Sequence, residues 1–121
     1  MATVELNKEN FESTVADSSI AIIDFWAPWC GPCKSFAPTF EAVSETHDDV
    51  LFGKVNTEEQ QELGAHFNIR SIPTLMVIRD NIVLFSQAGA LPKSALEGII
   101  EQSKALDMHQ VHAEIAKNQA T

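Results

Sequence analysis

The feature that most constrains the fold is a near-continuous apolar run at residues 19–26, which contains one charged side chain. The run is SIAIIDFW, and Asp24 is its only ionisable residue. A continuous apolar run of this length is typical of a central strand that is covered on both faces of a sheet. Covering both faces requires helices on both sides, so the run favours an α/β fold. We expect Asp24 to be buried within this strand, with a raised pKa.

The rest of the chain alternates between helix and strand patterns. The order β-α-β-α-β-α-β-β-α predicts a mixed sheet with parallel crossovers, a terminal hairpin and helices on both faces. Besides residues 19–26, strands are expected at 50–56 and within 74–89, where Asp80 and Asn81 form a tight turn. The expected helices are 8–17 capped by Asn7, 30–47, 57–67 capped by Thr57, and 91–106 with Pro92 in its first turn.

Length and charge limit the possible classes of function. At 121 residues the chain is expected to form one domain with a core that needs no crosslink. It contains no apolar run long enough for a membrane span, and its start lacks a signal-peptide pattern, so we expect a cytoplasmic protein. The net charge of −9 arises entirely within residues 1–62, and no basic patch is present. Nucleic-acid binding is therefore not expected.

The two cysteines of the chain, Cys30 and Cys33, are separated by Gly31 and Pro32. Residues three apart on a helix share a face, about 5–6 Å apart at Cβ, so this pair can form and open a disulfide with little backbone movement. At the start of a helix, free N–H groups and the macrodipole favour the reactive thiolate. Pro32 is tolerated in a first turn, and Gly31 leaves room for another chain to approach.

Two other interpretations of the cysteine pair are open. Together with His109 and His112 it could form a Cys2His2 zinc site, although the two residues between these histidines are fewer than the usual three to five. A purely structural disulfide would close a four-residue loop, which constrains the unfolded chain little. A reactive dithiol fits the pattern best.

Several motifs resemble the thioredoxin family. They are WCGPC followed by Lys and Ala-Pro, then KVN, IRSIPTL and GALPK, in the family's order between about residues 3 and 106. The resemblance implies a thioredoxin fold and a protein-disulfide reductase that binds no cofactor itself. It also implies disulfide-containing client proteins as substrates and a flavin-dependent, NADPH-using thioredoxin reductase as electron donor. We expect a monomer.

The resemblance also implies roles for individual residues. Cys30 would attack the substrate disulfide, and Cys33 would resolve the mixed disulfide. Asp24 matches the buried carboxylate that the family keeps behind the cysteines, where it could exchange protons with Cys33. Lys54 matches the lysine near that carboxylate, although a solvent-facing lysine at this position is an open alternative.

A substrate groove is the second expectation from the resemblance. Pro73 matches the family's cis-proline, and the backbone of Ile72 would pair with an extended substrate segment. An aromatic residue directly before a reactive cysteine is expected to be exposed, whereas Trp26 is expected to pack beneath the site. The predicted substrate-binding residues are Trp29, Gly31, Pro32, Ile72, Pro73, Gly89 and Ala90.

The C-terminus departs from the family pattern. We expect a thioredoxin domain at residues 1–106 and an extension at 107–121, in which Met108, Val111 and Ile115 recur at helical spacing. The extension is expected to dock on its own domain; docking on a partner or a second protomer is the alternative. The tail also supports a second function class, a thioredoxin-like binding or chaperone module. Asn81 stands where the family commonly has glycine, which leaves the turn type open.

Overall fold

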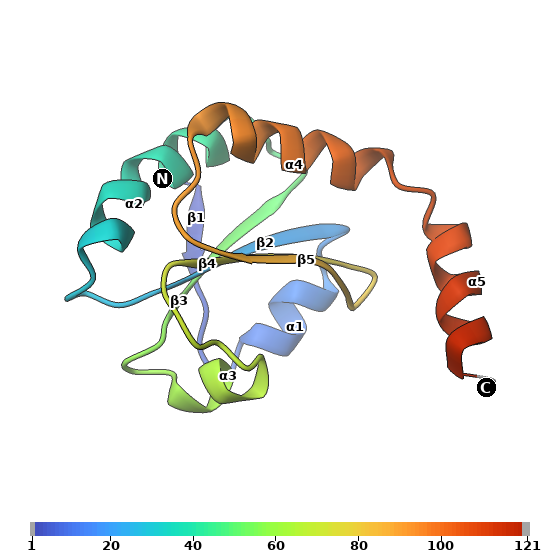
Figure 1. Cartoon of the computed structure of the whole chain (residues 1–121), viewed down its shortest axis with the longest axis horizontal. Helices are drawn as coiled ribbons and strands as arrows, with labels where there is room; N and C mark the ends of the chain where they lie inside the picture. The colour runs from blue at the N-terminus through green and yellow to red at the C-terminus, as the bar shows by residue number, and fades with distance from the viewer. Residues whose placement is uncertain (1, 120–121) are drawn as a thin grey trace.

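Five strands form one mixed sheet, with helices on both faces, in the computed structural model, which describes residues 2–119 (Figure 1). The elements are β1 (Thr3–Glu5), α1 (Phe11–Ala16), β2 (Ile20–Trp26), α2 (Gly31–Ser44), β3 (Leu51–Asn56), α3 (Gln61–His66), β4 (Thr74–Arg79), β5 (Ile82–Ala88), α4 (Lys93–Ala105) and α5 (Met108–Gln119). The strand order is β1-β3-β2-β4-β5; β1, β3 and β2 are parallel, whereas β4 and β5 are antiparallel to their neighbours. The predicted α/β architecture is confirmed.

Strand β2 lies at the centre of the sheet, and both of its faces are covered by helices. Figure 1 shows α2 and α4 on one face of the sheet and α1 and α3 on the other. Ile20 and Ile22 belong to the core cluster that includes side chains of α2 and α4. Ala21, Ile23 and Phe25 belong to the cluster on the α1 side. Alternate residues thus face opposite cores, which explains why apolar residues occupy consecutive positions of this strand.

The starts of α1 and α3 differ from the sequence prediction. Asn7 was expected to cap a helix from residue 8, but α1 begins at Phe11, and the Asn7 side chain instead accepts the N–H groups of Glu9 and Asn10 in the preceding turn. The predicted Thr57 cap is wrong. The Thr57 hydroxyl donates to the Trp26 carbonyl, 3.0 Å away, and α3 begins only at Gln61.

Two other helices are also shorter than predicted. Helix α2 ends at Ser44 rather than near residue 47. Pro92 precedes α4 as its N-cap residue instead of lying in the first turn. Proline's fixed φ suits both positions, so composition alone did not separate them.

The β4–β5 turn and the C-terminal helix meet at one corner of the molecule. Asp80 and Asn81 both have positive φ angles, 55° and 61°, as a two-residue hairpin turn with left-handed backbone requires. Helix α5 follows α4 beyond this hairpin (Figure 1), and the His112 ring lies 3.2 Å from the Asp80 carboxylate. The expected helix beyond the core is confirmed; residues 120 and 121 of the predicted extension lie outside the described residues.

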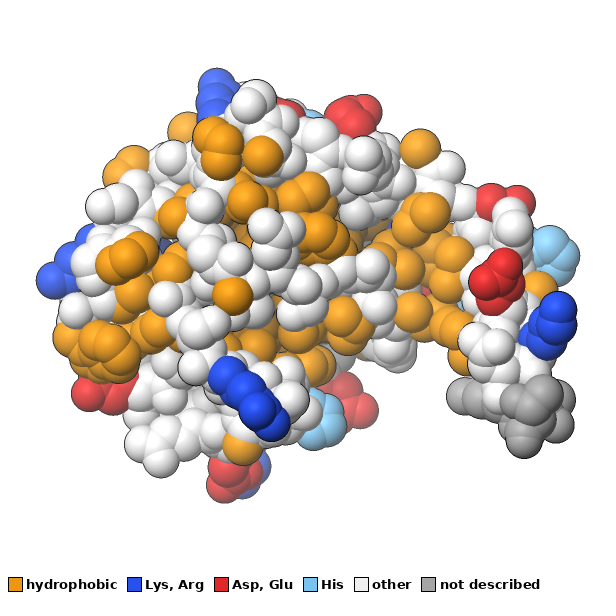
Figure 2. Space-filling model, in the orientation of Figure 1, with side chains coloured by type: hydrophobic (Ala, Val, Ile, Leu, Met, Phe, Trp, Pro, Cys, Tyr) orange, Lys and Arg blue, Asp and Glu red, His pale blue; other side chains and the backbone are white. Residues whose placement is uncertain are grey.

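Hydrophobic side chains are exposed near this corner. Figure 2 shows them between α4 and β5 and at the link into α5. Among the exposed large hydrophobic residues are Val83 on β5 and Leu106 in the link. Among residues 2–119, no helix is both long and apolar enough to cross a membrane.

Candidate functional site

The cysteine pair lies where β2 gives way to α2. Cys30 is the N-cap residue of α2, and its Sγ accepts the backbone N–H of Cys33 at 3.2 Å. The two cysteines form a disulfide with their Cα atoms 5.2 Å apart, so they are partners of each other and not of a histidine. Cys30 is 5% exposed and Cys33 is 2% exposed. When the disulfide opens, the Cys30 sulfur is therefore at the positive end of a helix, which stabilises a thiolate.

The segment around Pro73 packs directly against this pair. The Ile72–Pro73 bond is cis, as the resemblance implied. The Cys30 Sγ lies 3.8 Å from the Ile72 carbonyl oxygen, and the Ile72 side chain packs on the cluster that contains both cysteines. The Pro73 carbonyl accepts the N–H of Gly89 at 2.8 Å, which connects the start of β4 to the end of β5.

The remaining predicted substrate-binding residues lie at the surface. Gly31, Pro32 and Ala90 are exposed, and Trp29 is the most exposed large hydrophobic residue described, at 68%. Trp29 and Ala90 take no part in the two backbone contacts above. Their position in a substrate groove stays a prediction.

Asp24 is buried one strand position before Phe25, on the face of β2 that α2 covers. It is 1% exposed, and neither carboxyl oxygen has a hydrogen-bond partner among the described residues. Burial raises the pKa of Asp24 to about 7, Lys54 opposes that rise, and Glu5 adds to it. A carboxyl with a pKa near 7 can both accept and release a proton at physiological pH.

The alternative interpretation, a lysine that points freely into solvent, does not describe Lys54. It is half-buried on β3, in register with Asp24 on β2. Its Nζ lies 4.7 Å from the centre of the Trp26 ring, a cation–π contact that holds the ammonium over the sheet. Trp26 is half-buried and packs on the cysteine cluster, as expected for a residue beneath the site.

Sequence reasoning missed Glu5 as a neighbour of the site. Glu5 ends β1 and is in register with Lys54 on β3. Nothing in a three-residue strand reveals that pairing. Only the parallel alignment of residues 3–5 with 52–54 could have indicated it.

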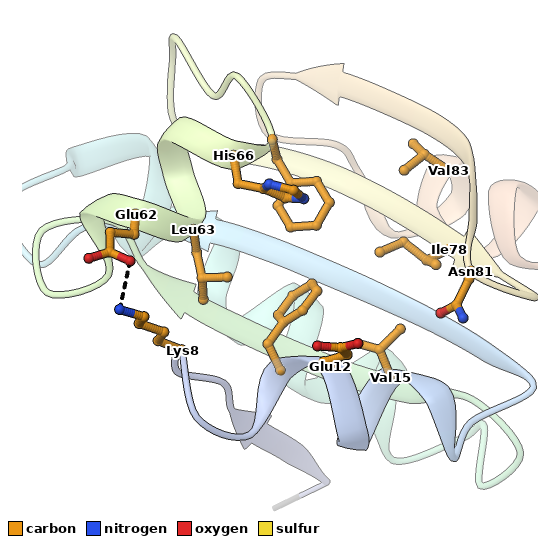
Figure 3. Close-up of a pocket in the computed structure, with 11 residues that line it drawn as sticks. Lys8, Glu12, Val15, Glu62, Leu63, His66, Ile78, Asn81 and Val83 are labelled. Carbon is orange, nitrogen blue, oxygen red and sulfur yellow. Dashed lines mark ion pairs between the residues drawn. The ribbon is translucent and has the colours of Figure 1, made fainter.

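A hollow elsewhere on the surface is separate from the cysteine pair. It has a volume of about 590 Å³ and lies between α1, α3 and the β4–β5 hairpin. Figure 3 shows Leu63, Val15 and Ile78 facing this space and the ion pair of Lys8 with Glu62, 2.8 Å long, at one end. None of the predicted site residues lines it.

Comparisons with known proteins agree with this geometry. The thioredoxin family model matches residues 2–102. A Streptomyces coelicolor protein provisionally named thioredoxin 2 is 52% identical over 119 residues, which is 98% of this chain and 89% of that protein. The thioredoxin of Haemophilus influenzae is 45% identical over 101 residues, covering 82% of this chain and 94% of its own.

Solved structures give the same result. A mutant thioredoxin from Halobacterium salinarum superimposes with a TM-score of 0.81 at 26% identity, covering 87% of this chain and 93% of that one. A Plasmodium falciparum thioredoxin superimposes with a TM-score of 0.76 at 35% identity, covering 81% and 96%. The family match and the Cys30–Cys33 pair at the active-site position together assign the chain to the thioredoxin family of protein-disulfide oxidoreductases.

Proposed function

We propose that this protein is a general protein-disulfide reductase in which Cys30 is the attacking thiol and Cys33 the resolving thiol. The observation that supports this assignment is the position of the Cys30 sulfur. It accepts an N–H at the start of α2 and lies against the Ile72 carbonyl, whereas Cys33 is one turn further in and more buried. The helix terminus favours the thiolate at Cys30.

The reaction consists of two exchanges. In the first, the Cys30 thiolate attacks a client disulfide; the client S–S bond breaks, a Cys30–client bond forms, and the second client sulfur leaves as a thiolate that takes a proton from water. In the second, Cys33 loses its proton and attacks the Cys30 sulfur, which releases the first client sulfur. Two electrons pass to the client, and the Cys30–Cys33 disulfide remains.

Asp24 is the proposed base for Cys33. Its carboxyl is buried on the side of β2 that α2 covers, and its pKa of about 7 lets it accept the Cys33 proton near neutral pH. Lys54, in register with Asp24, limits the rise of that pKa. Without Lys54 the carboxyl would hold its proton more tightly and would be a poorer base at pH 7.

Client recognition is proposed to use backbone pairing at Ile72 and a shallow surface around it. The exposed Trp29 indole offers an apolar contact beside Cys30, and Gly31 and Pro32 leave the approach open. Gly89 donates its N–H to the Pro73 carbonyl and Ala90 follows it in the chain, which supports a role for both residues at this edge. A surface of this kind accepts many extended segments, which suits a general reductase.

Family membership implies disulfide substrates and a reductase that returns electrons to the dithiol. We propose that this partner is a flavin-dependent thioredoxin reductase using NADPH, that the protein is monomeric, and that it works in the cytoplasm. The acidic half of the chain, residues 1–62, would favour a partner with a basic surface.

Three variants test the reductase against the alternative of a binding module. Reduction of a model disulfide protein with dithiothreitol or reductase should be lost in Cys30→Ser. Cys33→Ser should instead accumulate covalent client adducts through Cys30. The double serine variant is the matched control, because it keeps the surface and removes the chemistry. Equal activity in Cys30→Ser, or equal client retention by the double variant, would contradict the reductase assignment.

A further inference from the structure

Three ionisable side chains, an acid, a base and an acid, form one row across the sheet. Glu5 on β1 is in register with Lys54 on β3, and Lys54 is in register with Asp24 on β2. The three strands are parallel and adjacent, and register partners on neighbouring strands share a face. The row therefore reads carboxylate, ammonium, carboxyl from the sheet edge to its centre.

Exposure changes steeply along this row. Glu5 lies on the edge strand and is exposed, Lys54 is half-buried, and Asp24 is 1% exposed. A cavity of about 370 Å³ opens beside the row and is lined by Glu5, Trp26 and Glu59, among others. The Lys54 ammonium lies over the Trp26 ring at the same place. The lysine thus stands between a solvated acid and a buried acid.

Lys54 acts on both carboxyls. It lowers the pKa of Asp24, which burial raises, and Glu5 raises it further. Partial burial raises the pKa of Glu5, which Lys54 lowers and Glu59 raises. Lys54 therefore favours the charged form of both carboxyls, and the negative charge of Glu5 opposes that effect at Asp24.

Within residues 2–119, the other elements around Asp24 add no cation that lowers its pKa. Strand β4 places the uncharged Leu75 in register with it. Helix α2 contributes the Cys30–Cys33 disulfide and Glu41, whose carboxyl accepts a hydrogen bond from Thr3 on β1. Among the described residues, Lys54 is the base that shifts Asp24, and Glu5 is the acid that opposes it.

We propose that Glu5 is a positioning residue of the redox reaction, which competes with Asp24 for the Lys54 ammonium and so keeps the Asp24 carboxyl able to carry a proton near neutral pH. The inference rests on the proposed role of Asp24 as the base for Cys33. Glu5 itself touches no reacting atom. Its effect passes through the field of two neighbouring charges, so it should appear in the pH dependence rather than in substrate binding.

The size of the effect follows from strand spacing. Glu5 and Asp24 are two strands apart, about 10 Å, so a unit charge on one changes the pKa of the other by about 0.3 to 1 unit for an effective dielectric between 80 and 20. Solvent around the exposed Glu5 favours the lower part of this range.

The test is to titrate Asp24 in the oxidised Glu5→Gln variant and to monitor the Asp24 carboxyl by carbon-13 NMR. The Asp24 pKa should fall by about 0.3 to 1 unit. Glu9→Gln is the matched control, since Glu9 is an exposed acid of the same segment that lies outside the row. This substitution should leave the Asp24 pKa unchanged. Lys54→Met should raise the Asp24 pKa, because Lys54 lowers it.

Activity provides the second measurement. The pH at which reduction of a model disulfide protein reaches half its maximum should fall in Glu5→Gln by the same amount, with KM unchanged. An unmoved Asp24 pKa in Glu5→Gln, or an equal shift in Glu9→Gln, would overturn the inference. An unchanged pH profile in Asp24→Asn would instead overturn the proposed role of Asp24, whatever Glu5→Gln does to the NMR titration.

Discussion

Replacing Asp24 with asparagine keeps the size of the side chain and removes its ability to ionise. The parent carboxyl is buried without a hydrogen-bond partner among the described residues, and burial is the main cause of its raised pKa. A buried carboxyl of this kind is tolerated when neutral and costly when charged. Asparagine resembles the protonated form, so the variant should lack the cost of charging.

The pKa of Asp24 gives the size of this effect. The pKa is about 7 in the folded protein against an ordinary value of 3.8 for aspartate, and each unit corresponds to about 1.4 kcal/mol, so charging the buried group costs about 4 kcal/mol. Because the folded pKa is the higher one, the folded state binds the proton more tightly. The associated stability is fully present below pH 3.8 and is lost as the pH rises through about 7.

Guanidinium unfolding of the oxidised proteins across this range, followed by fluorescence of Trp26 and Trp29, measures the difference. Asp24→Asn should equal the parent in free energy of unfolding near pH 4 and exceed it by about 4 kcal/mol near pH 8. Asp48→Asn is the matched control, because Asp48 is exposed in a loop and its substitution should leave the difference from the parent independent of pH.

The pH dependence is what decides the outcome. A gain in Asp24→Asn that is equal at pH 4 and pH 8 would mean that packing, not ionisation, separates the two proteins. No gain at pH 8 would mean that the folded protein keeps the charged carboxylate without cost. Either result would refute the argument from burial, and with it the reason for proposing Asp24 as a base.

Four further predictions concern other contacts. Gly53→Ala should lower the free energy of unfolding by about 1–3 kcal/mol, because its methyl group would overlap the buried Leu6 side chain. Arg79→Met should lower it by about 1–2 kcal/mol, because the guanidinium donates to three carbonyls at the end of α4. Denaturant unfolding measures both. Trp29→Ala should change stability by less than about 0.5 kcal/mol, since the side chain is 68% exposed, and should raise KM for protein disulfides in steady-state assays. A chain ended after Leu106 should melt at a lower temperature if α5 docks on its own domain, and thermal unfolding with mass measurement checks this.

Different results would contradict each of these. Wild-type stability in Gly53→Ala would show that Leu6 can move aside, and wild-type stability in Arg79→Met would show that solvent satisfies the α4 carbonyls equally well. An unchanged KM in Trp29→Ala would remove the indole from the substrate surface. If the chain ended after Leu106 keeps the melting temperature and the oligomeric state of the full chain, the tail docks neither on its own domain nor on a second copy.

Elements whose cause is local could be predicted from the sequence. The run at 19–26 contains β2, the cysteine pair lies at the start of α2, and Asp80 with Asn81 forms the hairpin turn. Each depends on neighbours in the chain: a near-continuous apolar run, a proline in the first helical turn, and two residues that tolerate positive φ.

One prediction that failed involves a side chain with a choice of partner. Thr57 has the residue type of a helix cap, but the Trp26 carbonyl, 31 positions away in the chain, takes its hydroxyl. Asn56 accepts the N–H of Glu58 in its place. A sequence pattern ranks a residue's local options and cannot weigh them against a carbonyl that only the folded sheet brings near.

By itself the sequence determined the chemistry available and the order of elements: a dithiol at a helix start, a lone acid in a buried strand, and alternating helices and strands. The tertiary structure decided what surrounds them. It placed the Ile72 carbonyl 3.8 Å from the Cys30 sulfur and aligned Glu5, Lys54 and Asp24 across three strands. Strand order and register depend on how all the elements pack together, so contacts across the sheet are not encoded in any local stretch.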